Sequence, residues 1–203
     1  WDADLGGLFT TPDDGEALIT RQKDLFDNAT PSANSMAAVG LLRLAALLLD
    51  DLKLDRVVLG GLSMGGYVTM AFLRRYPERV SGLVLANTKA TADNDKAAAN
   101  RIGIAHALEH THSAEPLIES VFTNLLGETT RSSKPAVADA VKAAIRATPP
   151  DAAAWAEYAM ASRMDSLDVL RSAEIPALVI AGEEDALITD RDISAMASAL
   201  PDA

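Results

Sequence analysis

The chain has 203 residues, of which 49% are hydrophobic, and it carries a formal net charge of −11 without any cysteine. This length suits one ordinary domain or two small ones, with enough apolar residues for a substantial core. The acidity argues against binding nucleic acid or an anionic membrane, because no local basic patch offsets it. The absence of cysteine excludes disulfides, thiolate metal sites and a cysteine nucleophile, and it suits a reducing compartment, so we expect a cytoplasmic protein.

The first 50 residues predict one helix and no targeting signal. Residues 1–30 favour loops and a hairpin around the turn sequence PDDG. A helix is expected from about residue 32 to Leu49, with Thr30 or Ser32 as its cap. Its apolar stretch, residues 36–49, contains Arg43 and is shorter than the roughly 20 residues that span a bilayer. The acidic start lacks the basic region of a signal peptide, and the missing initial Met is typical of a processed or internal fragment.

From residue 51 onward, strands and helices alternate. Apolar runs at 56–63, 80–88 and 175–182 are typical of fully buried strands. Helices are expected at 64–76 and 190–200, where the apolar spacing is helical. Residues 89–171 are rich in alanine and predict helices broken at Gly103, Gly127, Pro135 and 148–150. This order predicts an α/β fold, with a parallel sheet of about three strands and helical crossovers.

The glycines of the sequence GGLSMGG, residues 60–66, follow the first predicted strand. A phosphate-binding P-loop requires a lysine that is missing here. The glycine spacing also fits no register of the dinucleotide-binding fingerprint Gly-x-Gly-x-x-Gly. The remaining interpretation is Gly-x-Ser-x-Gly, the nucleophile elbow, which matches in full at a strand-to-helix junction.

The elbow interpretation assigns a role to each residue of this turn. Ser63 is the candidate nucleophile, because a sharp turn presents its hydroxyl above the edge of the sheet. We expect Gly61 and Gly65 to be the elbow glycines, where the strand and the helix pass too closely for side chains. The N–H of Met64 opens the following helix and is the candidate oxyanion donor.

A catalytic serine also needs a carboxylate and a histidine. Glu183, Glu184 and Asp185 follow the third strand, at the carboxyl end where the sites of α/β proteins gather. We favour Asp185 over the simpler interpretation of a solvated acidic loop. The second strand ends in Asn87 and Thr88 and therefore offers no competing acid.

The histidines do not complete this set. His106, His110 and His112 all precede Asp185, whereas the chain order of a hydrolase triad is Ser, acid, His. Their spacing does not match the zinc motif His-Glu-x-x-His, so an exposed helix end is the favoured interpretation. We expect no metal and no cofactor, and it stays open whether one of these histidines replaces the missing base.

Two stretches, DRVVLGGLSMGGYVTM with its continuation to residue 88 and IPALVIAGEEDALIT, resemble the α/β-hydrolase fold, in particular enol-lactonase-like members. This resemblance covers residues 46–203 and implies a partial hydrolase domain at 49–203. It implies Ser63 as nucleophile, Asp185 as acid, Met64 as oxyanion donor and residues 89–171 as a helical cap. The family's first four strands and its eighth strand with the histidine have no counterpart in the chain.

Residues 6–45, with the sequence DNATPSANS, resemble instead a segment of bacterial thioredoxin-domain proteins with an α/α-toroid region. The two resemblances predict a mosaic, with a foreign segment at 1–48 joined near residues 46–50. The first strand of the sheet then lacks a partner on one side, and residues 7–11, residues 16–21 or a second chain are candidates to cover it.

Two functions follow from these residues. The first is a serine hydrolase of small esters or lactones, weak or inactive without a histidine base. The alternative is a non-catalytic interaction module that pairs through the open sheet edge. Four cap residues stay undecided between pocket lining and plain core: Trp155, Tyr158, Met160 and Met164.

Overall fold

The computed structural model describes residues 33–201, so the predictions for residues 1–30 lie outside the described part of the chain. Its elements, in order, are α1 (Ala33–Asp51), β1 (Val57–Leu62), α2 (Met64–Arg75), the 3₁₀ turn η1 (Pro77–Arg79), β2 (Val80–Ala86), α3 (Asp95–Thr111), α4 (Glu115–Leu125), α5 (Glu128–Ser133), α6 (Pro135–Ala147), α7 (Pro150–Ala161), α8 (Leu167–Arg171), β3 (Ala177–Ile180) and α9 (Asp190–Ala199).

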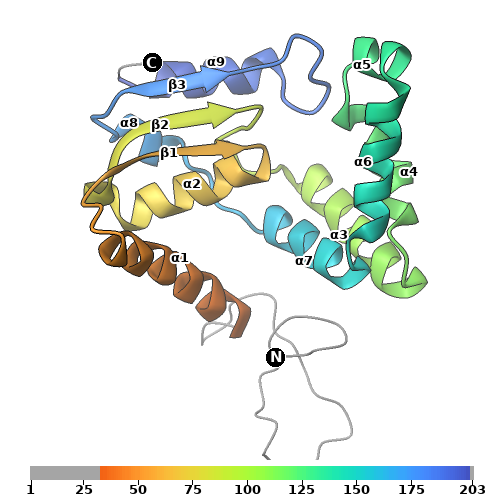
Figure 1. Ribbon diagram of the computed structural model, residues 1–203, viewed down its shortest axis with the longest axis horizontal. Coiled ribbons are helices and arrows are strands. Elements are labelled where there is room, and N and C mark those ends of the chain that lie inside the picture. Colours follow the sequence, from red (N-terminus) through yellow and green to blue (C-terminus); the bar gives the residue numbers. More distant parts are fainter. Residues whose placement is uncertain (1–32, 202–203) are drawn as a thin grey trace, which may run out of the picture.

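The three strands form a parallel sheet in the order β1-β2-β3, as the alternation of strands and helices predicted (Figure 1). Leu62 pairs with Ala86, and Ala86 pairs with Ile180, so the carboxyl ends of all three strands lie in one row. The segments that follow these three residues therefore meet at one edge of the sheet. Ser63, Asn87 and the acidic loop all belong to these segments.

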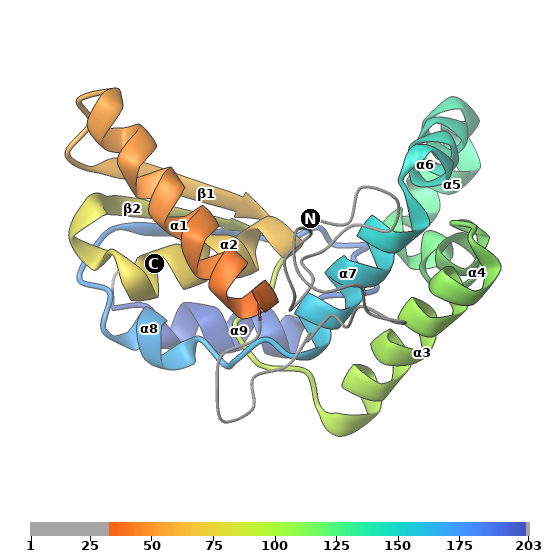
Figure 2. The same ribbon diagram turned by 90° about the horizontal axis from the view of Figure 1, so that it is seen from below.

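Helices cover one face of this sheet. The strands lie in front of α2, α8 and α9 in Figure 1, and α1 crosses in front of α2 in Figure 2. The buried side chains under this face form the main core, which includes Met70, Leu85, Leu170 and Met196. Leu170 belongs to α8, so the end of the predicted helical insert packs with the sheet and is not part of the cap.

The other face of β1 and β3 is exposed in the described part of the chain, which corrects the expectation of full burial for these two strands, whereas β2 has no exposed residue. Exposure alternates along β1 and β3. Val58 is 66% exposed and Leu62 is 67% exposed, whereas Val57 and Leu59 are partly buried and Leu59 packs against the main core. An apolar run in a strand predicts burial on both faces only where a second layer of helices is present.

Helices α3 to α7, residues 95–161, form a separate cap with its own core. This core lies mainly between α3 and α7 and includes Ile104, Leu108 and Tyr158. Gly127, Pro135 and Pro150 stand at helix starts, as expected. Gly103 does not break a helix, because it lies inside α3, where one glycine is tolerated at a cost of about 1 kcal/mol.

Helix α1 lies where the sequence predicts a helix, from about residue 32 to Leu49. Ala46 is buried in the main core, whereas Leu44 and Leu48 are exposed. No helix among residues 33–201 has both the length and the apolar character needed to cross a bilayer.

Candidate active site

Ser63 stands at the junction of β1 and α2 in strained backbone. Its φ of 50° and ψ of −116° are unusual for a residue other than glycine. The neighbouring segment holds this geometry: the N–H of Ser63 donates to the carbonyl of Ala86 at 2.9 Å, and Thr88 Oγ1 donates to the carbonyl of Ser63 at 2.8 Å. Strain of this kind persists only where the surroundings determine it, and here both polar groups of the Ser63 backbone are engaged.

The close approaches around Ser63 fall on Gly61 and Gly66. A Cβ at Gly61 would overlap the backbone of Gly65, and a Cβ at Gly66 would overlap the side chain of Thr88. A Cβ at Gly65 would meet nothing within 4 Å. We expected Gly61 and Gly65 to be the two positions without room for a side chain. In the structure these positions are Gly61 and Gly66, and Gly65 contributes only its backbone, which faces Gly61.

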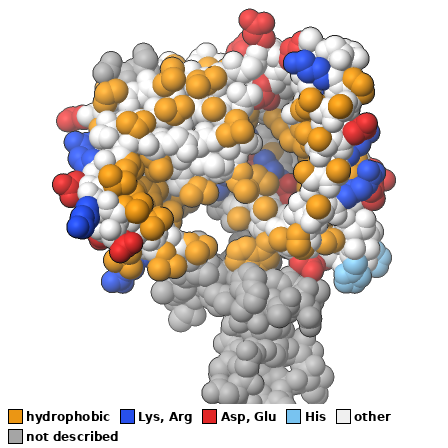
Figure 3. Space-filling view, viewed as in Figure 1, with side chains coloured by type: hydrophobic (Ala, Val, Ile, Leu, Met, Phe, Trp, Pro, Cys, Tyr) orange, Lys and Arg blue, Asp and Glu red, His pale blue; other side chains and the backbone are white. Residues whose placement is uncertain are grey.

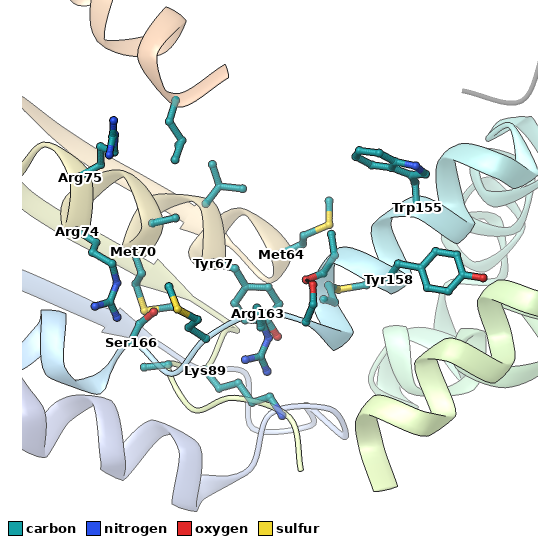
Figure 4. Close-up of a pocket in the computed structure, with 18 residues that line it drawn as sticks. Met64, Tyr67, Met70, Arg74, Arg75, Lys89, Trp155, Tyr158, Arg163 and Ser166 are labelled. Atoms are coloured by element: carbon teal, nitrogen blue, oxygen red, sulfur yellow. Dashed lines mark hydrogen bonds between the residues drawn. The ribbon is translucent and has the colours of Figure 1, made fainter. Parts of the chain in front are cut away.

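Met64 is the first residue of α2. Its N–H is therefore among the helix N–H groups that have no carbonyl partner within the helix. Such groups, at the positive end of the helix dipole, attract an anion. The side chain of Met64 points away from the sheet into a cavity described below (Figure 4).

Asp185 lies in the loop after β3 and is held by three hydrogen bonds. Asn87 Nδ2 donates to Oδ2 at 2.8 Å, and the N–H groups of Leu187 and Ile188 donate to Oδ1 at 2.8 and 3.0 Å. Asn87 follows β2 with a φ of 43°, and its own N–H donates to the carbonyl of Ile180. Sequence reasoning dismissed Asn87 because it is not an acid, whereas the structure makes it the residue that orients one.

The two other acids of this loop have different surroundings. Glu183 is exposed. Glu184 accepts hydrogen bonds from the N–H and the hydroxyl of Thr129 in α5, and these bonds hold the pKa of the Glu184 carboxyl below its ordinary value. A Cβ at Gly127 would overlap Glu184, so a glycine there permits the contact. Glu184 thus ties the far end of the cap to the loop that carries Asp185.

The three histidines lie in the cap, at the end of α3. His106 and His110 are exposed on the helix, and His112 ends it with a φ of 49°. The ring of His106 contacts the edge of Tyr158, with 6.0 Å between ring centroids. Among residues 33–201, no hydrogen bond joins a histidine to Ser63 or Asp185, and no three His, Asp or Glu side chains are arranged as metal ligands.

An ion cluster that sequence reasoning missed anchors the cap beside the site. The side chain of Asp93 is 1% exposed and pairs with Lys89 at 2.8 Å, Arg101 at 2.6 Å and Arg163 at 2.8 Å. Arg101 also pairs with the buried Glu157 of α7 at 3.0 Å. Burial alone raises the pKa of Asp93, but the hydrogen bonds from Lys89 and Arg101 and the charges of Arg101 and Arg163 outweigh it and lower that pKa. The cluster joins the segments that enter and leave the cap.

A cavity of about 670 Å³ lies between α1, α2 and the cap (Figure 4). The molecule is visibly hollowed between its sheet half and its cap half (Figure 3). Trp155, Tyr158, Met160 and Met164 all line this cavity. Tyr158 also packs in the cap core; its burial, its hydrogen bond to Glu109 and the charge of Glu109 raise the pKa of the phenol to about 12.

Comparisons with known proteins agree with this geometry. The profile of the family described as serine aminopeptidase, S33, a hydrolase family, matches residues 43–203. A thermophilic esterase from Thermogutta terrifontis, with malate bound, is 35% identical with a TM-score of 0.74; the match covers 81% of this chain and 60% of the esterase chain.

Two further solved structures share the fold. The enol-lactonase from Burkholderia xenovorans LB400 is 24% identical with a TM-score of 0.69, and a hydrolase from Pseudomonas aeruginosa PA01 is 24% identical with a TM-score of 0.68. These matches cover 81% of this chain and 61% and 60% of the other chains. The chain thus spans about three fifths of the length of the solved chains it matches.

Gly66 and Gly65 offer a matched pair of substitutions. We expect Gly66→Ala to lower the free energy of unfolding by about 1–3 kcal/mol, because the new Cβ overlaps Thr88 and strains the Ser63 turn. Gly65→Ala adds a methyl group in open space and should leave stability unchanged or raise it by up to about 1 kcal/mol through helix propensity. Urea unfolding of both variants measures the difference, and equal losses would contradict the assignment of the close approach to Gly66.

The Asp93 cluster predicts a pH-dependent contribution to stability. Asp93→Asn should cost about 3 kcal/mol near neutral pH, because it leaves partly buried cations without this carboxylate. The folded-state pKa of Asp93 lies below the ordinary value of 3.8, so its stabilisation is present above that value and is lost as pH falls through the folded pKa. Unfolding free energies of wild type and variant should therefore converge below pH 3.8.

The exposed Asp139 of α6 provides the control for this substitution. Asp139→Asn should change stability by less than about 0.5 kcal/mol at every pH. A constant gap between the wild type and Asp93→Asn down to acid pH would refute the ion-pair account.

Proposed function

Because the chain belongs to the serine aminopeptidase S33 family, with the α/β-hydrolase fold, we propose that it is a serine hydrolase of small esters or lactones. In this proposal Ser63 is the nucleophile, Met64 N–H stabilises the oxyanion and Asp185 is the triad acid. The observation that carries the proposal is the strained backbone of Ser63 at the strand-to-helix junction. A serine in this position presents its hydroxyl above the carboxyl edge of a parallel sheet.

The proposed reaction proceeds through an acyl-enzyme. Ser63 Oγ attacks the carbonyl carbon of the ester and passes its proton to a base; the tetrahedral oxyanion faces the N–H of Met64. The alcohol then leaves with a proton, and water releases the acid from Ser63. In a lactone the leaving alcohol stays attached to the acyl group.

The proposed reaction needs a base that takes the proton of Ser63, and this base is not identified among the described residues. In the proposal, Asp185 orients a histidine at the sheet edge that carries Ser63, and the hydrogen bond from Asn87 to Asp185 supports this role. The three histidines of the sequence lie in or beside α3, and in the described structure none of them forms a hydrogen bond with Ser63 or Asp185. Loss of one triad member typically leaves about 10³–10⁴-fold catalysis over water, so we expect slow turnover.

A fluorophosphonate probe tests the nucleophile directly. We expect slow, stoichiometric labelling of the wild type, read by intact mass, and none of Ser63→Ala, because only an activated serine attacks the probe. If labelling occurs, replacing His106, His110 and His112 by alanine in turn identifies any histidine that serves as base. A folded wild-type sample that stays unlabelled would contradict the proposed nucleophile.

The open edge of β1 favours a second candidate function, pairing with another copy of this chain. β1 pairs only with β2 in the described structure, and its sequence VVLGGL carries no charge that would discourage pairing. A two-fold axis would place the β1 strands of two copies antiparallel, each meeting the same surface of the other.

Particle mass in solution tests this pairing. We expect a dimer that Val58→Lys converts to monomer, because Val58 is exposed on the edge strand and a charge there opposes pairing. Val137→Lys, at an exposed position of α6 in the cap, is the control and should leave the dimer intact. A monomeric wild type at high concentration would exclude this function.

A further inference from the structure

The cavity between the sheet and the cap has a charge that contrasts with the rest of the chain. Among the residues that the structure describes, four cations line it, Arg74, Arg75, Lys89 and Arg163, and no carboxylate side chain does. The whole chain carries a net charge of −11. Most other lining groups are apolar, among them Met64, Trp155 and Met164. An acidic protein that lines its large cavity with cations and apolar side chains offers a place for an amphipathic anion.

The cations differ in how far they are neutralised. Arg74 forms two hydrogen bonds with the carboxylate of Asp168, both at 2.7 Å, and is satisfied by that partner. Lys89 and Arg163 instead share Asp93 with Arg101, and Glu157 contacts Arg101 alone. Three cations therefore meet two carboxylates in direct contact. Asp192 is a third carboxylate near Lys89, whose charge helps to lower the pKa of Asp192. Lys89 and Arg163 are the two members of this cluster that face the cavity.

Lys89 and Arg163 both keep hydrogen-bond donors that no described residue uses. The side chain of Arg163 is 10% exposed, and its Nε is buried without a hydrogen-bond partner in the described structure. Its guanidinium lies 4.2 Å from the ring centroid of Tyr67, another cavity residue. Within residues 33–201, Lys89 Nζ pairs with Asp93 only, which leaves ammonium hydrogens for a further acceptor. Figure 4 shows Lys89 and Arg163 together on one side of the cavity, with Met64 and Trp155 on another.

We infer that this cavity binds an amphipathic carboxylate, with the carboxylate at Lys89 and Arg163 and the apolar part against Met64, Trp155 and Met164. Met64 connects the cavity to the candidate nucleophile, because it follows Ser63 directly. The substrate class is then an ester or lactone that carries a second, free carboxylate; this assignment of substrate rests on the proposed hydrolase function. Binding of the anion itself does not need Ser63.

Decanoate and 1-decanol are matched probes, since they share an apolar chain and differ in charge. We expect decanoate to bind about tenfold more tightly than decanol by isothermal titration calorimetry, because charge-assisted hydrogen bonds to Lys89 strengthen its binding. Lys89→Met should remove this preference, while Lys96→Met, at an exposed position of α3, should keep it. Equal affinities of the two probes, no binding of either, or equal effects of the two lysine variants would overturn the inference.

A second pair of variants avoids any risk to folding. Met164 lines the cavity and is 71% exposed, so Met164→Glu places a carboxylate there without disturbing the core. It should weaken decanoate binding about tenfold and leave decanol binding unchanged, whereas Met164→Gln should affect neither. An equal loss of both probes in Met164→Glu would contradict a charge-selective site.

The substrate assignment is tested separately from the nucleophile. Ser63→Ala should bind decanoate as the wild type does, and wild type should hydrolyse mono-4-nitrophenyl succinate with a lower KM than 4-nitrophenyl butyrate. Decanoate preference without hydrolysis of either ester would overturn the hydrolase proposal and the substrate class but leave the binding site. Hydrolysis of both esters with equal KM values and no decanoate preference would overturn the binding site and leave the hydrolase.

Discussion

The site depends on the way the β2 segment holds the turn at Ser63. The carbonyl of Ala86 and the hydroxyl of Thr88 engage both polar backbone groups of Ser63, and Gly66 lets the Thr88 side chain approach α2. A φ of 50° at a serine is unfavourable in an unconstrained loop, so these contacts must offset its cost. The parallel register brings the contacts into reach, because Leu62 and Ala86 end their strands side by side.

The same register extends the site to the third strand. Asn87 lies one residue beyond Ala86. Its backbone N–H donates a hydrogen bond to the carbonyl of Ile180, and its side-chain amide donates one to Asp185. One segment after β2 therefore fixes the candidate nucleophile on one side and the candidate acid on the other. Ser63 and Thr88 are 25 positions apart in the sequence, and Asn87 and Asp185 are 98 positions apart. Hydrogen bonds nevertheless join all four residues at one edge of the sheet.

Local patterns predicted much of this fold, and contacts between distant segments account for the rest. The run VVLGGLSMGG contains its own strand, turn and helix signals, so the elbow could be located from residues 57–66 alone. The roles of Gly66, Asn87 and Asp93 could not, because each depends on a partner that no spacing reveals: Thr88, Asp185 and Arg163. The open face of the sheet was missed for a similar reason, since apolar strands carry no signal of which faces receive helices.

The cap and the cavity are coupled because the ion cluster around Asp93 anchors the cap and also contributes cations to the cavity lining. Asp93 holds the segments entering and leaving the cap only while Arg101 and Arg163 remain paired with it, and Arg163 also faces the cavity. Changing the charge of the cavity through Arg163 would therefore remove one ion pair of this anchor at the same time. Lys89 is different, because Asp93 keeps two arginine partners without it. Lys89 is thus the position at which the charge of the cavity can change while the anchor of the cap is retained.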